Sequence, residues 1–186
     1  NWRSVDRCCM AMNSSSIKIY TYYENINFKQ QGELVDLWWQ SWRANGFDPI
    51  VLSLEDAKKS PYHDEFVDQI QSLVEEVTGG PLSRCVMSCY FRWLAYSTQA
   101  DADSFLVSDY DVINRSFSSV QLIEPKDKIA FMNRWCPCLA YGTKDQFLAF
   151  CKEIIASTRE HIDEIKASYV AQKDRCYHDQ NFLVLN

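Results

Sequence analysis

The chain has 186 residues, of which 47% are hydrophobic and 24% are charged, and its formal net charge at pH 7 is −6. This composition predicts one folded domain over residues 1–186 and excludes a disordered chain. The negative charge disfavours a nucleic-acid partner, which normally meets a basic stripe, and no apolar stretch is long enough for a membrane span in this chain.

The first part of the chain alternates strand-like and helical patterns. Residues 16–23 are rich in β-branched and aromatic side chains, which favour a strand. Apolar residues at helical spacing predict a helix over residues 33–45, and residues 49–52 have the pattern of a short second strand. Ser53 and Asp56 have the spacing of a capping box, which predicts a brief helix after that strand.

The middle of the chain continues the alternation. A helical period of apolar residues predicts a helix over residues 66–77, and residues 82–98 form a further helical pattern that is apolar nearly all round. A short apolar run at residues 104–107 follows a polar loop, as expected for a buried central strand. Residues 128–131 and 139–141 have strand-like patterns.

A final helical pattern has Phe147, Cys151 and Ile154 on one face, and Thr143 and Gln146 are placed to cap it. Strands that alternate with helices predict an α/β fold with a mainly parallel central sheet flanked by helices. Such sheets bind ligands at the carboxyl ends of their strands. The residues that follow the first and the central strands are therefore candidates for a binding site.

Two aspartates directly follow the predicted central strand. On extended chain, Asp109 and Asp111 point to the same side, and adjacent carboxylates repel each other unless a cation lies between them. Mg²⁺ and Mn²⁺ take oxygen ligands and leave positions for phosphate oxygens, so the pair predicts a metal site that holds a diphosphate. A solvated acidic turn is the alternative, and it is the simpler interpretation for Asp101 and Asp103 in the preceding polar loop.

Two segments resemble the DxD-type nucleotide-sugar glycosyltransferases of the GT-A fold. They are Cys89-Tyr-Phe-Arg-Trp-Leu-Ala-Tyr96 with the following Phe105-Leu-Val-Ser-Asp-Tyr-Asp111, and the early helix, turn and strand of residues 38–52. The resemblance implies a single GT-A-like, Rossmann-like domain. It also implies metal-dependent transfer of a sugar from a nucleotide diphosphate-sugar donor to a hydroxyl group of a glycan, glycoprotein or lipid-linked acceptor, with Mn²⁺ or Mg²⁺ as cofactor.

The resemblance also implies roles for individual residues. Asp109 and Asp111 match the metal and diphosphate positions, and Arg92 matches a helix arginine near the donor. Thr21 and Tyr22 match the end of the first strand, where such folds hold the nucleotide. The alternative for Arg92 is burial against a carboxylate inside the domain.

A polar cluster near the C-terminus contains two further candidates. In transferases of this kind a late acidic or histidine residue often completes the metal shell or serves as the base. His178 is therefore expected as a metal ligand and Asp179 as the catalytic base that takes the acceptor proton. The alternative for Asp179 is a helix N-cap.

Two other patterns have structural interpretations. Trp38, Trp39 and Trp42 lie at helical spacing, which favours core packing over a sugar-stacking surface. Cys85 and Cys89 lie in the apolar helical pattern, where cysteine packs as a small hydrophobe, and this disfavours a zinc site with the later Cys-Pro-Cys motif.

Two other functions remain open from the residues. One is a non-catalytic nucleotide-sugar or glycan-binding domain of the same fold. The other is a phosphotransferase of the haloacid-dehalogenase type with Asp109 as the nucleophile, since an apolar strand followed by DxD also resembles the start of that family. That family places the motif on its first strand and needs a later lysine and a further acidic pair. The compartment is left open between the cytoplasm and the Golgi lumen.

Overall fold

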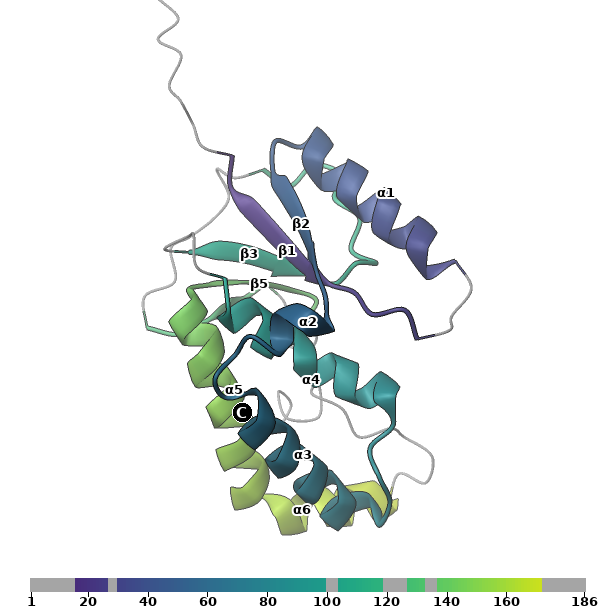
Figure 1. Cartoon of the computed structure of the whole chain (residues 1–186), viewed down its shortest axis with the longest axis vertical. Helices are drawn as coiled ribbons and strands as arrows, with labels where there is room; N and C mark the ends of the chain where they lie inside the picture. The colour runs from purple at the N-terminus through teal and green to yellow at the C-terminus, as the bar shows by residue number, and fades with distance from the viewer. Residues whose placement is uncertain (1–15, 27–29, 100–103, 119–126, 133–136, 172–186) are drawn as a thin grey trace, which may run out of the picture.

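The computed structural model describes residues 16–26, 30–99, 104–118, 127–132 and 137–171. A five-stranded sheet is flanked by helices (Figure 1). The strands are β1 (Lys18–Tyr22), β2 (Asp48–Leu52), β3 (Phe105–Ser108), β4 (Ala130–Phe131) and β5 (Leu139–Gly142). The helices are α1 (Gln31–Ala44), α2 (Leu54–Ala57), α3 (His63–Thr78), α4 (Arg84–Ser97), α5 (Lys144–Glu160) and α6 (Ile162–Ala171).

The sheet is mixed, with the strand order β2–β1–β3–β5–β4. The α/β fold with flanking helices is confirmed, but the prediction of a mainly parallel sheet is wrong, because among the described strands only the pairs β1 with β2 and β1 with β3 are parallel. β5 runs antiparallel to both β3 and β4. Only residues 132–138 separate β4 from β5, which is too few for the crossover helix that parallel neighbours need.

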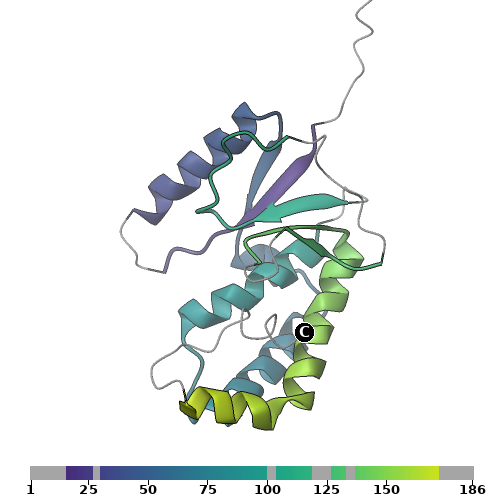
Figure 2. The ribbon, with the colours of Figure 1, turned by 180° about the vertical axis from the view of Figure 1, so that it is seen from behind.

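Side chains that alternate along the strands divide the core into two layers. Ile19 and Leu106 pack with Trp38 and Trp42 of α1 on one face of the sheet. Tyr20 and other residues of the opposite face pack with α3, α4 and α5. The views from opposite sides show α1 over one face and α4 and α5 over the other (Figures 1 and 2).

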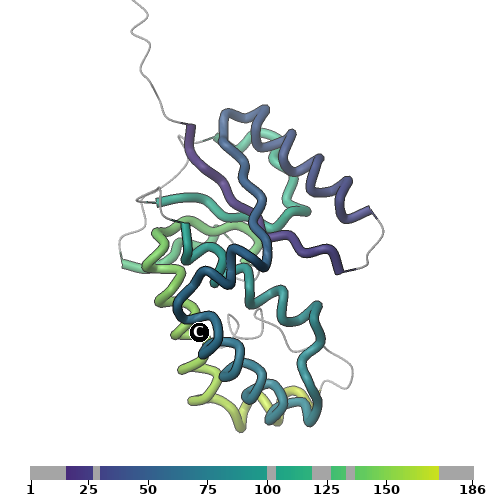
Figure 3. Tube along the Cα trace, in the orientation of Figure 1, coloured from purple at the N-terminus to yellow at the C-terminus, as the bar shows by residue number. Residues whose placement is uncertain are grey.

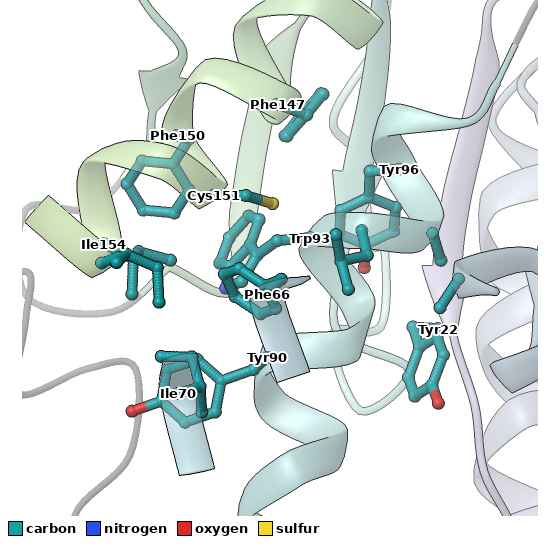
Figure 4. Close-up of a cluster of buried hydrophobic side chains, with 14 of the residues drawn as sticks. Tyr22, Phe66, Ile70, Tyr90, Trp93, Tyr96, Phe147, Phe150, Cys151 and Ile154 are labelled. Atoms are coloured by element: carbon teal, nitrogen blue, oxygen red, sulfur yellow. The ribbon is translucent and has the colours of Figure 1, made fainter. Parts of the chain in front are cut away.

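The larger core cluster is centred on α4 (Figure 4). Trp93 is fully buried, and its ring centroid lies 4.9 Å from that of Phe150 and 6.3 Å from that of Phe147 on α5. Burying an aromatic side chain of this size contributes roughly 2–3 kcal/mol. Arg92 to Tyr96 are all buried, so the prediction that this helix is covered on nearly every side is confirmed for its C-terminal half.

Local signals explain where several helices begin and end. The capping boxes at Ser53 and Thr143 are both formed. Gly79 ends α3 in the left-handed conformation, with φ 73°, which glycine adopts without steric cost. Gln30 precedes α1 with φ 74°, in the left-handed region. This conformation is unfavourable in free energy for any residue that has a side chain.

α3, α5 and α6 contact one another and lie on the side of the molecule away from α1 (Figure 3). Among the described residues, no helix is both long and apolar enough to cross a bilayer.

Candidate functional site

A cleft of about 410 Å³ lies at the carboxyl ends of β1 and β3. These strands are parallel neighbours, with Tyr20 opposite Val107, so their carboxyl ends lie side by side. The chain leaves β1 through α1 to reach β2 on one side, and it returns through α2, α3 and α4 to β3 on the other side. This reversal is a topological switch point, where open α/β sheets bind ligands.

Four of the residues expected to bind a ligand line this cleft. They are Tyr22 at the end of β1, Arg92 of α4, and Asp109 and Asp111 after β3. Thr21 lies one residue earlier, on the sheet face covered by α1. It is fully buried, and its hydroxyl has no hydrogen-bond partner among the described residues.

The other two expected site residues, His178 and Asp179, lie outside the described residues. Their predicted roles therefore stay predictions.

Arg92 and Asp109 form an ion pair inside the cleft. The Nη1 atom of Arg92 donates to Oδ1 of Asp109, and the guanidinium also lies 4.6 Å from the ring centroid of Trp93. The Arg92 side chain is 11% exposed and that of Asp109 is 27% exposed, so water screens the pair only partly. Two interpretations were given for Arg92, a position near a ligand and burial against a carboxylate. The structure combines them, because Arg92 pairs with Asp109 and also lines the cleft.

Asp111 differs from Asp109 in both exposure and partners. It is exposed, and no basic side chain pairs with it among the described residues. The expectation that the two aspartates lie on extended chain is wrong. The backbone N–H of Asp109 still donates to the Cys138 carbonyl, as in a strand, but residues 110–111 form a turn. The turn is closed by the N–H of Val112, which donates to the Asp109 carbonyl at 3.1 Å. The turn keeps both aspartates on the lining of the cleft.

The described residues fit a divalent ion only in part. They contain no group of three or more histidine, cysteine, aspartate or glutamate residues arranged to hold a metal. Asp109 and Asp111 would supply carboxylate oxygens, and hard cations such as Mg²⁺ complete their shells readily with water and phosphate oxygens. The donor set therefore suits a weak site that a diphosphate would complete.

A third carboxylate in the cleft, Glu24, was not found from the sequence. Its side chain is only 7% exposed, and it accepts hydrogen bonds from Arg84 Nε at 2.7 Å and from the Tyr22 hydroxyl at 3.1 Å. Burial and then the negative charge of Glu24 raise the pKa of Tyr22 far above its usual range. No spacing pattern links Glu24 to Arg84, which lies 60 positions later.

Helix α1 fixes the segment that carries the aspartates. Trp38 Nε1 donates to Ser108 Oγ at 2.6 Å, and Trp42 Nε1 donates to the Val112 carbonyl at 3.0 Å. The core-packing prediction is wrong for Trp39, which lies about 100° round the helix from Trp38 and is 38% exposed, and it is confirmed for Trp38 and Trp42, which are almost completely buried. Their indole nitrogens additionally position the backbone on both sides of the Asp109–Asp111 turn.

The N-terminal end of α1 adds a polar contact to the same turn. Gln31 lines the cleft and is buried, and its Nε2 donates to the Tyr110 hydroxyl at 2.8 Å. The ring of Tyr23 contacts that of Tyr110 edge-on, with centroids 5.7 Å apart. Burial raises the pKa of Tyr110, so its hydroxyl keeps its proton at neutral pH.

Two cysteines of α4 also line the cleft. Cys85 is exposed and Cys89 is half-buried one turn later, so the prediction that both pack as small hydrophobes is wrong for Cys85. The reason is that the first turns of α4 border the cleft, whereas burial begins at Tyr90.

A second cavity, of about 450 Å³, lies between α3 and the junction of α5 and α6. Two pairs of polar side chains border it: Arg159 donates to Gln69 at 3.2 Å, and Lys166 donates to Glu76 at 2.6 Å. The strand-end cleft, which lies at the switch point of the sheet and holds a buried unpaired amide atom, is the stronger candidate site.

Comparison of the chain with models of protein families, with curated proteins and with solved structures gave no significant match. The inference of function therefore depends on the residues of the cleft.

Proposed function

We propose that this chain is a glycosyltransferase domain that moves a sugar from a nucleotide diphosphate-sugar to a hydroxyl acceptor. The observation that carries the proposal is the position of Asp109, Asp111 and Arg92 around one cleft at the switch point of the sheet. A diphosphate repels two carboxylates unless a cation lies between them, so the proposal includes Mn²⁺ or Mg²⁺ at the aspartates. The acceptor would be a glycan, a glycoprotein or a lipid-linked hydroxyl group.

The two aspartates would have different tasks. Asp111, exposed and without a basic partner among the described residues, would be the principal carboxylate for the ion. The charge of Asp109 is already balanced by Arg92. In this pair, Asp109 would hold the guanidinium of Arg92 close to the donor's diphosphate. When bound, the ion would supply Lewis-acid stabilisation of the departing diphosphate.

Calorimetry tests the binding step. UDP and GDP are titrated into the protein with and without Mn²⁺, and the titrations are repeated with Asp111→Asn and with the control Asp163→Asn, which changes an exposed aspartate of α6. We expect Mn²⁺ to strengthen binding of one nucleotide at least tenfold, with the gain lost in Asp111→Asn and kept in Asp163→Asn. Equal affinities with and without Mn²⁺ in the wild-type protein would remove the metal from the proposal.

A turnover assay separates the transferase from the two alternatives. With a nucleotide-sugar and water, a transferase breaks the bond between the anomeric carbon and the diphosphate and releases free sugar and nucleoside diphosphate. Binding without release of sugar from a panel of nucleotide-sugars would favour the non-catalytic binding domain. Hydrolysis of p-nitrophenyl phosphate that is lost in Asp109→Asn would favour the phosphotransferase.

A further inference from the structure

The side-chain amide of Gln31 has one polar atom that the fold leaves unused. Gln31 is 9% exposed and lines the cleft, and its Nε2 is bonded to the Tyr110 hydroxyl. In this orientation its Oε1 is buried and has no hydrogen-bond partner among the described residues. A buried polar atom without a partner costs roughly 1–3 kcal/mol, so a ligand group that bonds to Oε1 regains a substantial part of that cost.

The chemistry of Oε1 restricts which ligand group can lie there. A carbonyl oxygen of an amide only accepts hydrogen bonds, and the oxygens of an ionised diphosphate also only accept them. The group facing Gln31 must therefore be an N–H or O–H donor and not an oxygen of the diphosphate. The Tyr110 ring, held by Gln31 and contacted edge-on by Tyr23, offers an aromatic surface beside this acceptor.

We infer that Gln31 is a specificity-determining contact for the nucleoside part of the ligand. Its Oε1 accepts a hydrogen bond from the ring N–H of the base or from the ribose 2′-hydroxyl, while the diphosphate lies toward Asp109 and Asp111. This inference rests on the proposed function, because it takes the ligand to be a nucleotide. Tyr110 acts as a positioning residue that holds the amide in the receptive orientation.

The experiment compares analogues that lack a single donor. Dissociation constants are measured by calorimetry in the presence of Mn²⁺ for UDP and GDP, and then for two analogues of the tighter ligand. One analogue carries a methyl group on the ring N–H (3-methyl-UDP or 1-methyl-GDP), and the other lacks the ribose 2′-hydroxyl. The wild-type protein is compared with Gln31→Met, which removes the acceptor, and with Gln31→Glu, which keeps an acceptor oxygen that Tyr110 can still bond.

The expected result is a ratio of affinities. In the wild-type protein, one analogue should bind about tenfold more weakly than its parent. The ratio of the analogue's dissociation constant to that of its parent should fall to about one in Gln31→Met. It should persist in Gln31→Glu, even where the added charge weakens the binding of both ligands. The analogue that loses affinity identifies the source of the donor, base or ribose.

Other outcomes overturn the inference. An unchanged ratio in Gln31→Met, or wild-type affinities that are equal for parent and both analogues, removes Gln31 as a contact while leaving the proposed function intact. Wild-type protein that binds neither UDP nor GDP removes both proposals. Gln31→Ala replaces Gln31→Met if thermal denaturation shows that the methionine variant is not folded.

Discussion

The guanidinium of Arg92 pairs with the carboxylate of Asp109, and this pair links α4 to the end of β3 at the lining of the cleft. The pair leaves Asp111 as the aspartate whose charge is not balanced by a basic side chain among the described residues. One side chain of the acidic motif therefore belongs to the fold as well as to the site, while the other is available to a ligand.

The pair can be measured by a double-mutant cycle in urea denaturation. Arg92→Met and Asp109→Asn should each lower the free energy of unfolding by about 1–3 kcal/mol, because each change leaves a partly buried charge without its partner. The double variant should lose less than the sum of the single losses, by about 1 kcal/mol. Lys59→Met, which breaks an exposed ion pair with Asp56, should cost no more than about 0.5 kcal/mol. Strictly additive losses at Arg92 and Asp109 would contradict the coupling.

The contact between Trp38 and Ser108 should matter to both stability and binding. Ser108→Ala leaves the buried indole N–H of Trp38 without an acceptor, at a cost of about 1–3 kcal/mol. The same change loosens the backbone before Asp109, so nucleoside diphosphate affinity should fall in calorimetry. Ser72→Ala, at an exposed position of α3, is the control and should alter neither quantity. A fully stable Ser108→Ala protein would show that the hydrogen bond contributes nothing.

Gln30 offers a test of backbone strain at the entrance to α1. With φ 74°, this position suits glycine, so Gln30→Gly should raise the free energy of unfolding by about 0.5–1 kcal/mol. For a chain of this size the midpoint of thermal unfolding should rise by roughly 2–4 °C per kcal/mol. The matched control is Gln40→Gly inside α1, which should lose about 1 kcal/mol. A decrease in the free energy of unfolding for both Gln30→Gly and Gln40→Gly would be incompatible with strain at Gln30.

Tyr22 should make the fold sensitive to alkaline pH. Burial and the charge of Glu24 raise its pKa above the ordinary value of 10.0, so the folded protein holds this proton more tightly than the unfolded chain does. The stabilising effect is complete below about pH 10 and is lost progressively as the pH rises above that value. In Tyr22→Phe, the decline in unfolding free energy should be shallower by about 1 kcal/mol between pH 10 and pH 11, and the difference in slope approaches about 1.4 kcal/mol per pH unit at higher pH. Urea denaturation between pH 8 and pH 11 measures both slopes, and identical slopes would rule out Tyr22 as the group responsible.

Much of the fold could be predicted from local patterns, because helix caps and the period of apolar residues act over a few positions. The helical spacing of Trp38 and Trp42 identified α1 and its buried face, and the Ser53 and Thr143 capping boxes are formed as expected. Strand direction was not accessible in the same way. The short connection between β4 and β5 does indicate antiparallel pairing of these two strands, but the antiparallel pairing of β5 with β3 depends on tertiary contact and has no local signal.

Some residues of the candidate site could likewise be predicted from the sequence, and others could not. Asp109 and Asp111 could be selected from their position after an apolar strand, and Arg92 and Tyr22 from the resemblance to sugar transferases. The structure brings these four to one cleft, whereas Thr21, selected with Tyr22, is fully buried and does not line it. The partners Glu24 and Arg84, and Gln31 and Tyr110, could not be selected, since each pair joins distant parts of the chain. Hydrogen bonds of that kind are decided by tertiary packing rather than by local propensity.

The two sides of the cleft also differ in how soon they can form during folding. The link between α4 and the turn after β3 spans 17 positions, whereas the links from α1 to the same segment span 70 to 79. Closing a longer loop costs more chain entropy before its contacts repay that cost. The α4 side can therefore assemble early with the main core, and the α1 side closes the cleft late. A transient detachment of α1 would abolish ligand binding while the core around Trp93 stays folded.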